Sequence, residues 1–330
     1  MSSVLLVCHV NAEIGIGHLS RLLALAETLR KDNNVIPEFL IFGDFIKKNE
    51  LADFNLHAFS LSDNFVTSVE RVMEAENFNA VVFDLYTKQD INNLDEFFLR
   101  LKECNIYLVG IDSLIEYCNI LDLIWIPSFN FDCSKYSNCT SVIKSGWDSF
   151  LIQKRLPSKK WSPGLKVLIL TGGSDVAKLS RTLPVQLNES LGKNVELHWV
   201  RGPFSEPPIL PDECRLEWHV HDAPTQLDEL IVHSDYVLTV FGVSLFEVLQ
   251  YGIPSVVFSP YGDKDDIELT SLSEEKVALV SDNAQSAVDN LIKLMNNDKL
   301  AREYSTNALN KLSVNGAQKL SEEIYSLIGV

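Results

Sequence analysis

A histidine beside a short glycine turn is the first group in the chain with the potential for chemistry. Gly15 and Gly17 precede His18, between an apolar run at Val4–Cys8 and a helical pattern that begins at Leu19. Backbone N–H groups at such a helix start bind phosphate or sugar oxygens well, and an imidazole titrates near neutrality, which suits an acid or a base. The turn indicates either a ligand contact with His18 in proton transfer, or a tight turn with a capping histidine. The third glycine of a dinucleotide fingerprint is absent.

A second glycine turn follows the apolar segment Val167–Leu170. It reads Thr171-Gly172-Gly173-Ser174-Asp175. Two glycines allow a ligand to approach the backbone closely, whereas Ser174 and Asp175 are also good helix N-caps. Both interpretations remain open for this turn.

A third turn follows the apolar segment Tyr236–Val240. Gly242 and Ser244 open a helical pattern there, with Glu247 one turn further along. A carboxylate at this place can accept hydrogen bonds from both hydroxyls of a ribose. An acidic residue early in a helix is also favoured by the helix dipole alone.

Acidic residues stand at the ends of two further strand candidates. Asp84, with Tyr86 close behind it, ends the segment Ala80–Asp84, and Asp112 follows Ile106–Ile111. Ligands of open α/β sheets lie beyond the carboxyl ends of the strands. The positions therefore favour a site, although caps and turns use the same residues.

Metal and nucleophile motifs are weak by comparison. His219 and His221 alternate on an extended segment and could share a face as metal ligands, but no third ligand has suitable spacing, so a pair of loop residues is the favoured interpretation. No metal site and no cofactor are predicted. The sequence also lacks a Walker A lysine motif and a Gly-x-Ser-x-Gly elbow.

The elements that must position these residues alternate between strand and helix patterns. The segment Leu156–Gly164, with two prolines and a glycine, reads as a linker, and the alternation restarts after it. This pattern predicts an α/β protein with two Rossmann-like, doubly wound parallel sheets, one in residues 1–156 and one in residues 157–330. We expect the two domains to face a central cleft and the last helices to pack back on the N-terminal domain.

Composition excludes several classes of partner. The formal net charge is −17, which argues against nucleic acid and against anionic lipid surfaces. No apolar run approaches the roughly 20 residues of a membrane helix, and the N-terminus does not read as a signal peptide. We therefore expect a cytoplasmic protein with no integral membrane segment. None of the six cysteines forms a C-x-x-C pair, so reduced thiols are expected. No oligomeric state is predicted.

Taken in chain order, the motifs resemble one family. They are similar to those of the UDP-sugar hydrolases of pseudaminic acid biosynthesis and of their spore-coat polysaccharide relatives. The segments that carry the resemblance are Ile14–Arg21, Val82–Tyr86, Gly172–Asp175, Trp199–Pro203 and Ser234–Pro254. The last segment also looks like the donor-site helix of the lipid-linked GlcNAc transferase of peptidoglycan synthesis.

The resemblance implies a glycosyltransferase-B (GT-B) fold with a UDP-sugar as the ligand. In the family pattern, the C-terminal domain holds UDP, with Glu247 on the ribose and the glycine turns on the diphosphate. The nucleotide-binding positions so implied are Gly172, Gly173, Ser174, Gly202, Gly242, Ser244 and Glu247. The implied sugar-side positions are Gly15, Gly17, Arg21, Asp84, Tyr86 and Asp112, and His18 matches the catalytic histidine. Backbone N–H groups rather than a metal would stabilise the leaving diphosphate.

The departures from the family pattern fall mainly on the sugar side. The paired aspartates of the family stand here as Asp112-Ser113, and Leu85 replaces a histidine. Three functions therefore stay open. The first is a UDP-sugar hydrolase that releases UDP from a modified amino sugar for surface-glycan synthesis, with His18 as general base. The second is a glycosyltransferase acting on a glycan or lipid-linked acceptor, and the third is a catalytically inactive nucleotide-sugar-binding protein.

Overall fold

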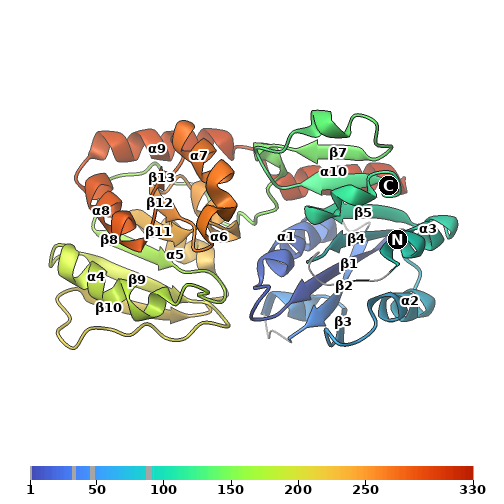
Figure 1. The fold of residues 1–330 in the computed structure, drawn as a ribbon, viewed down its shortest axis with the longest axis horizontal. Helices are drawn as coiled ribbons and strands as arrows, with labels where there is room; N and C mark the ends of the chain where they lie inside the picture. The colour runs from blue at the N-terminus through green and yellow to red at the C-terminus, as the bar shows by residue number, and fades with distance from the viewer. Residues whose placement is uncertain (1, 32–34, 45–48, 87–90, 92, 330) are drawn as a thin grey trace. The chain divides into compact units, whose positions relative to one another are not determined.

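Two parallel β-sheets organise the chain (Figure 1). The computed structural model describes residues 2–31, 35–44, 49–86, 91 and 93–329. The chain divides into a first unit, Met1–Gln153 with Asn315–Val330, and a second unit, Lys154–Val314. Each unit contains one of the sheets, and each has its own core.

The first unit holds a seven-stranded sheet of order β3-β2-β1-β4-β5-β6-β7 in the part of the chain that the structure describes. Its strands are β1 (Ser2–Val10), β2 (Val35–Gly43), β3 (Leu56–Phe59), β4 (Ala80–Asp84), β5 (Tyr107–Ile111), β6 (Leu123–Ile126) and β7 (Val142–Ser145). Its α-helices are α1 (Gly17–Lys31), α2 (Phe65–Ala75), α3 (Leu94–Glu103) and α10 (Gly316–Ile328). Short 3₁₀ turns lie at Asn49–Asp53, Ser113–Tyr117, Cys133–Tyr136 and Trp147–Ser149.

The central strands of this sheet are buried on both faces. Val4 to Cys8 of β1 have no exposed surface, as is typical of parallel sheets covered by helices on each side. The aromatic rings of α2 and α3 fill one face, where Phe65, Phe97 and Phe98 pack with Phe83. Helix α1 covers the other face with Leu19, Leu22 and their neighbours.

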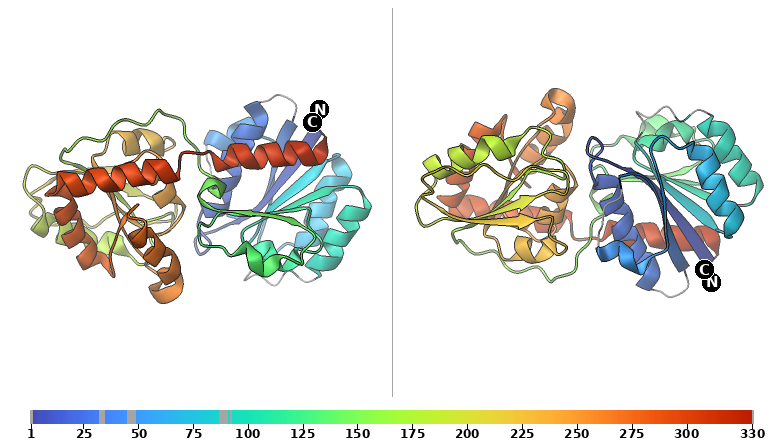
Figure 2. Two further views of the ribbon diagram at one scale, coloured as in Figure 1. Left: turned by 90° about the horizontal axis from the view of Figure 1, so that it is seen from above. Right: turned by 90° about the horizontal axis from the view of Figure 1, so that it is seen from below.

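Helix α10 brings the end of the chain back to the first unit. It lies beside α1, and the Tyr325 hydroxyl donates to the Leu29 carbonyl over 3.1 Å (Figure 2). At its start, Gly316 lies against the backbone of residues 149 and 150, where a Cβ atom would stand 2.4 Å from the Phe150 carbonyl oxygen. This close approach requires a residue without a side chain.

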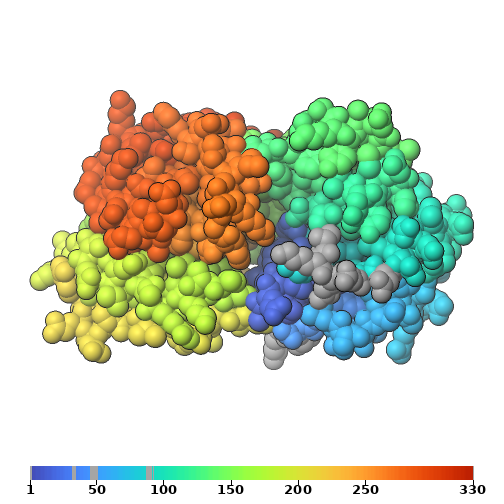
Figure 3. Space-filling view, in the orientation of Figure 1, coloured from blue at the N-terminus to red at the C-terminus, as the bar shows by residue number. Residues whose placement is uncertain are grey.

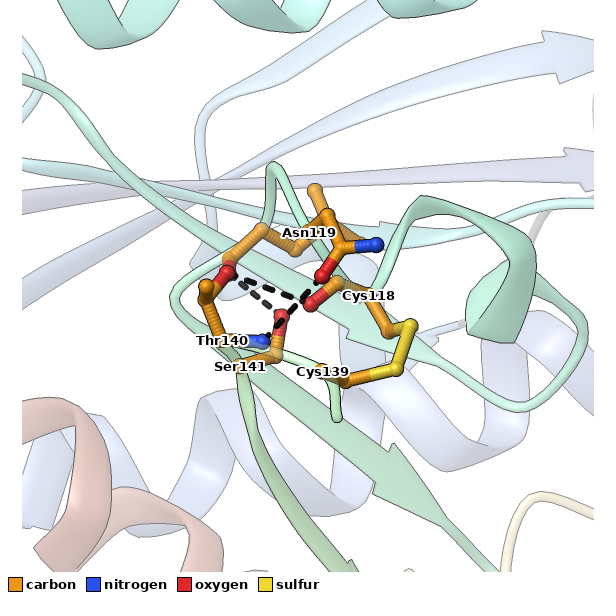
Figure 4. The surroundings of a disulfide bond; sticks show 6 residues. Cys118, Asn119, Cys139, Thr140 and Ser141 are labelled. Carbon is orange, nitrogen blue, oxygen red and sulfur yellow. Dashed lines mark hydrogen bonds between the residues drawn. A yellow bond between two sulfur atoms is a disulfide. The ribbon is translucent and has the colours of Figure 1, made fainter. Parts of the chain in front are cut away.

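A disulfide joins Cys118 to Cys139 in the first unit. Figure 4 shows that Thr140 and Ser141, next to Cys139, both donate to the Cys118 carbonyl, over 3.4 and 2.9 Å. The expectation of reduced thiols is wrong for this pair. The two hydrogen bonds hold the cysteine-bearing segments together, and the Cα–Cα distance of 5.4 Å is one that a disulfide can span. Cys8, Cys104, Cys133 and Cys214 are free.

The second unit repeats the plan with a six-stranded sheet of order β10-β9-β8-β11-β12-β13 among its described residues. Its strands are β8 (Lys166–Leu170), β9 (Glu196–Arg201), β10 (Glu217–Asp222), β11 (Tyr236–Val240), β12 (Ser255–Phe258) and β13 (Leu279–Val280). Its helices are α4 (Leu183–Ser190), α5 (Leu227–Val232), α6 (Val243–Leu249), α7 (Asp266–Glu274), α8 (Ala284–Met295) and α9 (Asp298–Lys311), with 3₁₀ turns at Leu179–Arg181 and Gly262–Asp265.

Helices cover both faces of the second sheet as well. Helices α4 and α8 pack on one face, around Trp199 and Tyr236, whereas α5 and α6 pack on the other, around Leu168 and Val237. Helix α7, orange in Figure 3, lies at the surface of this unit, and Ile267 on it is 72% exposed. The described strand pairs of both units are all parallel, which confirms the prediction of two doubly wound sheets.

The start of the second unit is anchored by a buried tyrosine. Tyr251 accepts hydrogen bonds from the backbone N–H groups of Arg155 and Leu156, over 3.2 and 3.3 Å. Its hydroxyl donates to Asp228, which also accepts from the Arg155 guanidinium over 3.2 Å. The chain that enters the unit is therefore held to α5 and to the end of α6.

Some predicted elements differ from the observed ones. The helix expected over Leu179–Leu191 is split into a 3₁₀ turn and α4, because Pro184 stands in the first turn of α4 and lacks the N–H that a longer helix would need. The helix expected over Asn92–Cys104 is observed as α3, and Asn92 lies outside the described residues. The strand expected at Arg215–Trp218 is observed as β10, two residues later. No described helix meets the length and apolarity that crossing a membrane requires.

The close packing at Gly316 predicts that Gly316→Ala lowers the free energy of unfolding by about 1–3 kcal/mol, because the methyl group must displace backbone. Gly192→Ala is the matched control, since no described atom lies within 4 Å of the Cβ position there. We expect the control to stay within about 0.5 kcal/mol of the parent or to gain slightly. Urea denaturation of the three proteins measures this, and equal effects of the two substitutions would contradict the packing of α10.

Candidate functional site

The switch point of the first sheet gathers the candidate catalytic residues. The chain leaves β1 toward β2 and β3 on one side and continues from β4 toward β5, β6 and β7 on the other. Ligands of open α/β sheets bind in the crevice at this reversal. His18 comes after β1, and Asp84 is the last residue of β4, so the topology places both at the same edge.

His18, Arg21 and Asp84 form a hydrogen-bonded group. His18 Nδ1 lies 2.6 Å from Asp84 Oδ1, although the two residues are 66 positions apart. Arg21 donates two hydrogen bonds to the same carboxylate, from Nε to Oδ2 over 2.9 Å and from Nη2 to Oδ1 over 2.6 Å. His18 and Arg21 are three residues apart on α1 and therefore share a helix face.

The contacts of His18 Nδ1 decide which ring nitrogen carries the proton. Arg21 Nη2 also lies 3.0 Å from Nδ1, but a guanidinium only donates. The ionised carboxylate of Asp84 only accepts, and its contact with Nδ1 is shorter. We therefore place a proton on Nδ1, which leaves Nε2 with its lone pair. A histidine oriented by a buried carboxylate in this way is arranged as a general base.

Asp84 is ionised in this arrangement despite complete burial. Burial alone would raise the pKa of its carboxyl, but the charges of Arg21 and His18 and their hydrogen bonds lower it below the ordinary value. Burial acts to lower the pKa of Arg21, but Asp84 and Asp112 outweigh it and raise that pKa. Asp84 thus stays a carboxylate beside the imidazole and can accept the hydrogen bond from Nδ1.

Asp112 joins the group from β5, the neighbour of β4. Its carboxylate accepts from Arg21 Nη1 over 3.0 Å and is half exposed. Its backbone has φ 63° and ψ −104°, a conformation that costs a residue with a side chain about 1–3 kcal/mol. The Asp112 N–H donates to the Trp125 carbonyl over 2.9 Å, and this bond on β6 helps to hold the strained backbone.

The glycine turn before α1 is closed by Asn11. The Asn11 carbonyl accepts from the Gly15 N–H over 2.8 Å, and its side chain accepts from Glu13 and Ile14. Gly15 has φ 80°, in the left-handed region that glycine adopts without strain. The turn and Gly17 together direct the chain into α1, with His18 in its first turn.

Tyr86 lies beside His18 and is oriented by His9. The Tyr86 N–H donates to His9 Nδ1 over 3.2 Å, and the rings of His18 and Tyr86 meet edge to face with centroids 6.5 Å apart. Burial, with a smaller effect of His18, lowers the pKa of His9 to about 4. His9 is therefore neutral at pH 7 and able to accept this hydrogen bond.

In the second unit the glycine turns gather at the corresponding switch point. The chain leaves β8 toward β9 and β10 on one side, and β11 starts the other side. Gly202, after β9, packs on the turn after β8, where a Cβ atom would stand 2.4 Å from the carbonyl oxygens of both Gly172 and Gly173. The Phe204 N–H donates to the Gly173 carbonyl over 3.0 Å and ties the two loops together.

Two hydroxyl groups in the turn after β8 are left without hydrogen bonds. The side-chain oxygens of Thr171 and Ser174 are buried and have no partner among the described residues. A buried hydroxyl without a partner costs about 1–3 kcal/mol, so such groups are typical of a site that a ligand completes. Asp175, in contrast, accepts from the N–H groups of Leu179 and Ser180 over 2.8 and 2.9 Å and caps the following turn.

The turn after β11 lies next to this loop. A Cβ atom on Gly172 would meet the Val240 side chain at 3.8 Å. Gly242 precedes α6, and Ser244 and Glu247 are three residues apart on it, both half-buried. The carboxyl ends of β9, β8 and β11 therefore bring together the loops that carry all seven predicted nucleotide-binding positions.

The two groups gather different kinds of residues. The first unit brings together His18, Arg21, Asp84, Asp112 and Tyr86, with Gly15 and Gly17 in the turn before α1. His9 and Thr171 were not predicted. His9 ends a buried strand one residue after Cys8, so a polar residue at the end of an apolar run is the signal that could have identified it.

Comparison with known proteins identifies solved structures that share this fold. The chain matches no protein-family model and no curated protein sequence, but it is similar to many solved structures. MurG of Acinetobacter baumannii is 15% identical with a TM-score of 0.67, and the match covers 99% of this chain and 100% of that chain. S. aureus MnaA, solved with UDP, is 13% identical with a TM-score of 0.65 over 100% and 97% of the two chains.

A plant protein gives a similar match. Phytolacca americana UGT2, complexed with UDP-2fluoro-glucose and pterostilbene, is 11% identical with a TM-score of 0.66 over 100% of both chains. At these identities the likeness shows the fold alone. The chain has the two-domain architecture of the GT-B glycosyltransferases, which confirms the predicted fold class.

The strained backbone of Asp112 predicts a difference between two substitutions that both remove its carboxylate. Asp112→Gly relieves the positive φ, whereas Asp112→Ala keeps it, so the glycine variant should be more stable by about 1–3 kcal/mol. Urea denaturation measures the difference. Equal stabilities would show that the backbone at Asp112 is not strained.

The low pKa of His9 predicts that stability falls in mild acid. The folded protein binds the His9 proton with a pKa of about 4 and the unfolded chain with about 6.5, so stability is lost as the pH falls from 6.5 toward 4, by roughly 3 kcal/mol. His9→Asn keeps an acceptor for the Tyr86 N–H but does not titrate in this window. Its unfolding free energy should therefore decline less steeply than that of the parent, and identical slopes would contradict the burial of a neutral His9.

Proposed function

We propose that this chain is a UDP-sugar-processing enzyme, in which the second unit binds UDP and His18 is the general base. The observation that carries the proposal is the His18–Asp84 contact at the switch point of the first sheet. An imidazole held at Nδ1 by a buried carboxylate that Arg21 also binds has the arrangement of a base. The same residues would be an unusual choice for a binding surface alone, because burying a charged pair is costly.

The reaction we favour is hydrolysis. His18 Nε2 takes a proton from water, and the water oxygen attacks the anomeric carbon of the sugar. The bond between that carbon and the diphosphate oxygen breaks, and UDP leaves with the electron pair. Asp84 stabilises the positive charge on His18 through Nδ1.

UDP is the ligand proposed for the loops of the second unit. The hydroxyls of Thr171 and Ser174 are donors for diphosphate oxygens. Gly172 and Gly242 leave room for the ligand to approach the backbone, because a Cβ atom there would meet only the Val240 side chain or nothing within 4 Å. The Glu247 carboxylate would accept hydrogen bonds from the ribose hydroxyls. MnaA and UGT2, which share the fold, were solved with UDP and with a UDP-sugar analogue, and this supports a uridine nucleotide.

Transfer to an acceptor is the second candidate. It uses the same base, with an acceptor hydroxyl in place of water, and several proteins that share the fold are glycosyltransferases by description, including a spinosyn forosaminyltransferase and the calicheamicin glycosyltransferase CalG4. An inactive binding protein would not need the His18–Asp84–Arg21 group. We therefore place hydrolysis and transfer ahead of binding alone.

The test follows UDP release from a panel of UDP-sugars, with and without sugar acceptors. Release without an acceptor indicates hydrolysis, and release only with one indicates transfer. His18→Ala should lower the rate about 10²–10⁴-fold with little change in UDP affinity. Glu247→Ala should weaken UDP binding about tenfold or more, measured by calorimetry.

His233→Ala is the matched control for the base. This histidine lies at the end of α5 and contacts the Glu229 carbonyl over 2.6 Å. It precedes β11, whereas the nucleotide loops follow the carboxyl ends of the strands. We expect parent rates and parent UDP affinity for it. Failure of the parent protein to bind UDP would contradict the donor site, and full activity of His18→Ala would contradict the base.

A further inference from the structure

Histidine and glutamate side chains gather on β9 and β10 of the second unit. Side chains of a strand alternate between its faces, and the parallel register pairs Glu196 with Glu217 and His198 with His219. His221 follows on the same face of β10. The sequence alone offered no third ligand beside His219 and His221, because the missing ligands stand about 20 residues earlier, on the neighbouring strand.

The ligand atoms of three of these residues lie close together. His198 Nε2 is 2.9 Å and His219 Nε2 is 3.5 Å from Glu196 Oε1, and one ligand atom from each of the three residues falls within 4.8 Å of the others. Zinc binds such atoms at about 2.0–2.2 Å, which separates the ligands of a tetrahedral site by roughly 3.4 Å. The observed spacing needs only small side-chain shifts to admit an ion.

One nitrogen of the group has no hydrogen bond. His219 Nε2 is buried and lacks a hydrogen-bond partner within the described ranges, although Glu217 Oε1 lies 3.2 Å away. The carboxylates are near this nitrogen but not aligned with it. A cation on the lone-pair axis of Nε2 would satisfy this nitrogen, and the carboxylates of Glu196 and Glu217 are near enough to bind the same ion.

His221 holds the ring of His198. His198 Nδ1 lies 3.0 Å from His221 Nε2, and the planes of the two rings differ by 6°. If Nδ1 donates in this contact, the lone pair of His198 is on Nε2, toward Glu196. Histidines that bind metals commonly donate their other N–H in this way, so His221 has the place of a positioning residue.

We propose that Glu196, His198 and His219 bind a divalent transition-metal ion of the zinc type. Two imidazoles and a carboxylate suit zinc or cobalt, and the fourth position is open to water or to Glu217. The ion joins β9 to β10, the edge strand of the sheet, which lies at the molecular surface, yellow in Figure 3. His198 stands four residues before Gly202, about 13 Å along the strand, so the ion is separate from the nucleotide loops and acts as a structural link.

An ion pair between Lys166 and Glu196 is the alternative to a bound metal ion. The Lys166 ammonium group lies 3.3 Å from both carboxylate oxygens of Glu196. Without a metal, the group is an ion pair surrounded by hydrogen-bonded histidines. The test must therefore separate a metal site from this network.

The test uses the full chain, stripped with a chelator and titrated with Zn²⁺ by calorimetry and with Co²⁺ by visible absorption. We expect one saturable equivalent at this site, the spectrum of tetrahedral cobalt, and a higher melting temperature with Zn²⁺. His198→Gln and His219→Gln should each weaken binding at least 100-fold and abolish the thermal shift. His221→Gln should weaken it about 10–100-fold.

His57→Gln is the matched control. His57 belongs to the other acid–histidine group found among the described residues, with Glu38 and Glu76 in the first unit. Binding that survives in His57→Gln but not in His219→Gln supports the proposal, provided that both metal-free variants melt like the parent. Parent-like affinity in His198→Gln and His219→Gln, or no saturable binding by the parent, would leave only the Lys166 ion pair and overturn it.

Discussion

The buried carboxylate of Asp84 is the interaction on which the first unit's chemistry depends. It is fully buried at the end of β4, and Arg21 and His18 provide its hydrogen bonds from α1. A buried ion pair of this kind is weak evidence for net stability, because desolvation offsets most of the attraction. Its effect is positional: it fixes the ring of His18, selects the nitrogen that carries the proton, and couples α1 to β4 and, through Asp112, to β5.

The two units use the same topological position for different purposes. Each sheet reverses its strand order at the centre, and each crevice there collects loops from neighbouring strands. In the first unit, charged side chains and a strained Asp112 meet at this point, which suits the movement of a proton. In the second unit, glycines meet there with two buried hydroxyls that have no hydrogen-bond partner among the described residues, which suits an anionic ligand bound by the backbone. The proposed enzyme depends on this difference, with proton transfer in the first unit and nucleotide binding in the second.

Much of the fold could be predicted from the sequence, because buried central strands such as Ala80–Asp84 and Tyr236–Val240 consist mostly of apolar residues. The edge strands β3 and β7 were not predicted, because they are short and half-exposed. Strand ends also placed His18, Asp84 and Asp112 individually at the correct sheet edge. Local sequence patterns do not encode strand register or helix rotation. They therefore could not predict the two hydrogen bonds from Arg21 to Asp84, the positive φ of Asp112 or the pairing of His198 with His219. The Cys118–Cys139 pairing likewise depends on loops that meet only in the fold.

The central claim is that Asp84 holds the proton of His18 on Nδ1 and leaves Nε2 as the base. Nitrogen NMR of the imidazoles, assigned with His18→Gln, measures this directly at a pH where His18 is neutral. The account predicts a protonated Nδ1 and an unprotonated Nε2 for His18, and a loss of this preference in Asp84→Asn. A protonated Nε2 in the parent protein, or the same tautomer in Asp84→Asn, would contradict it.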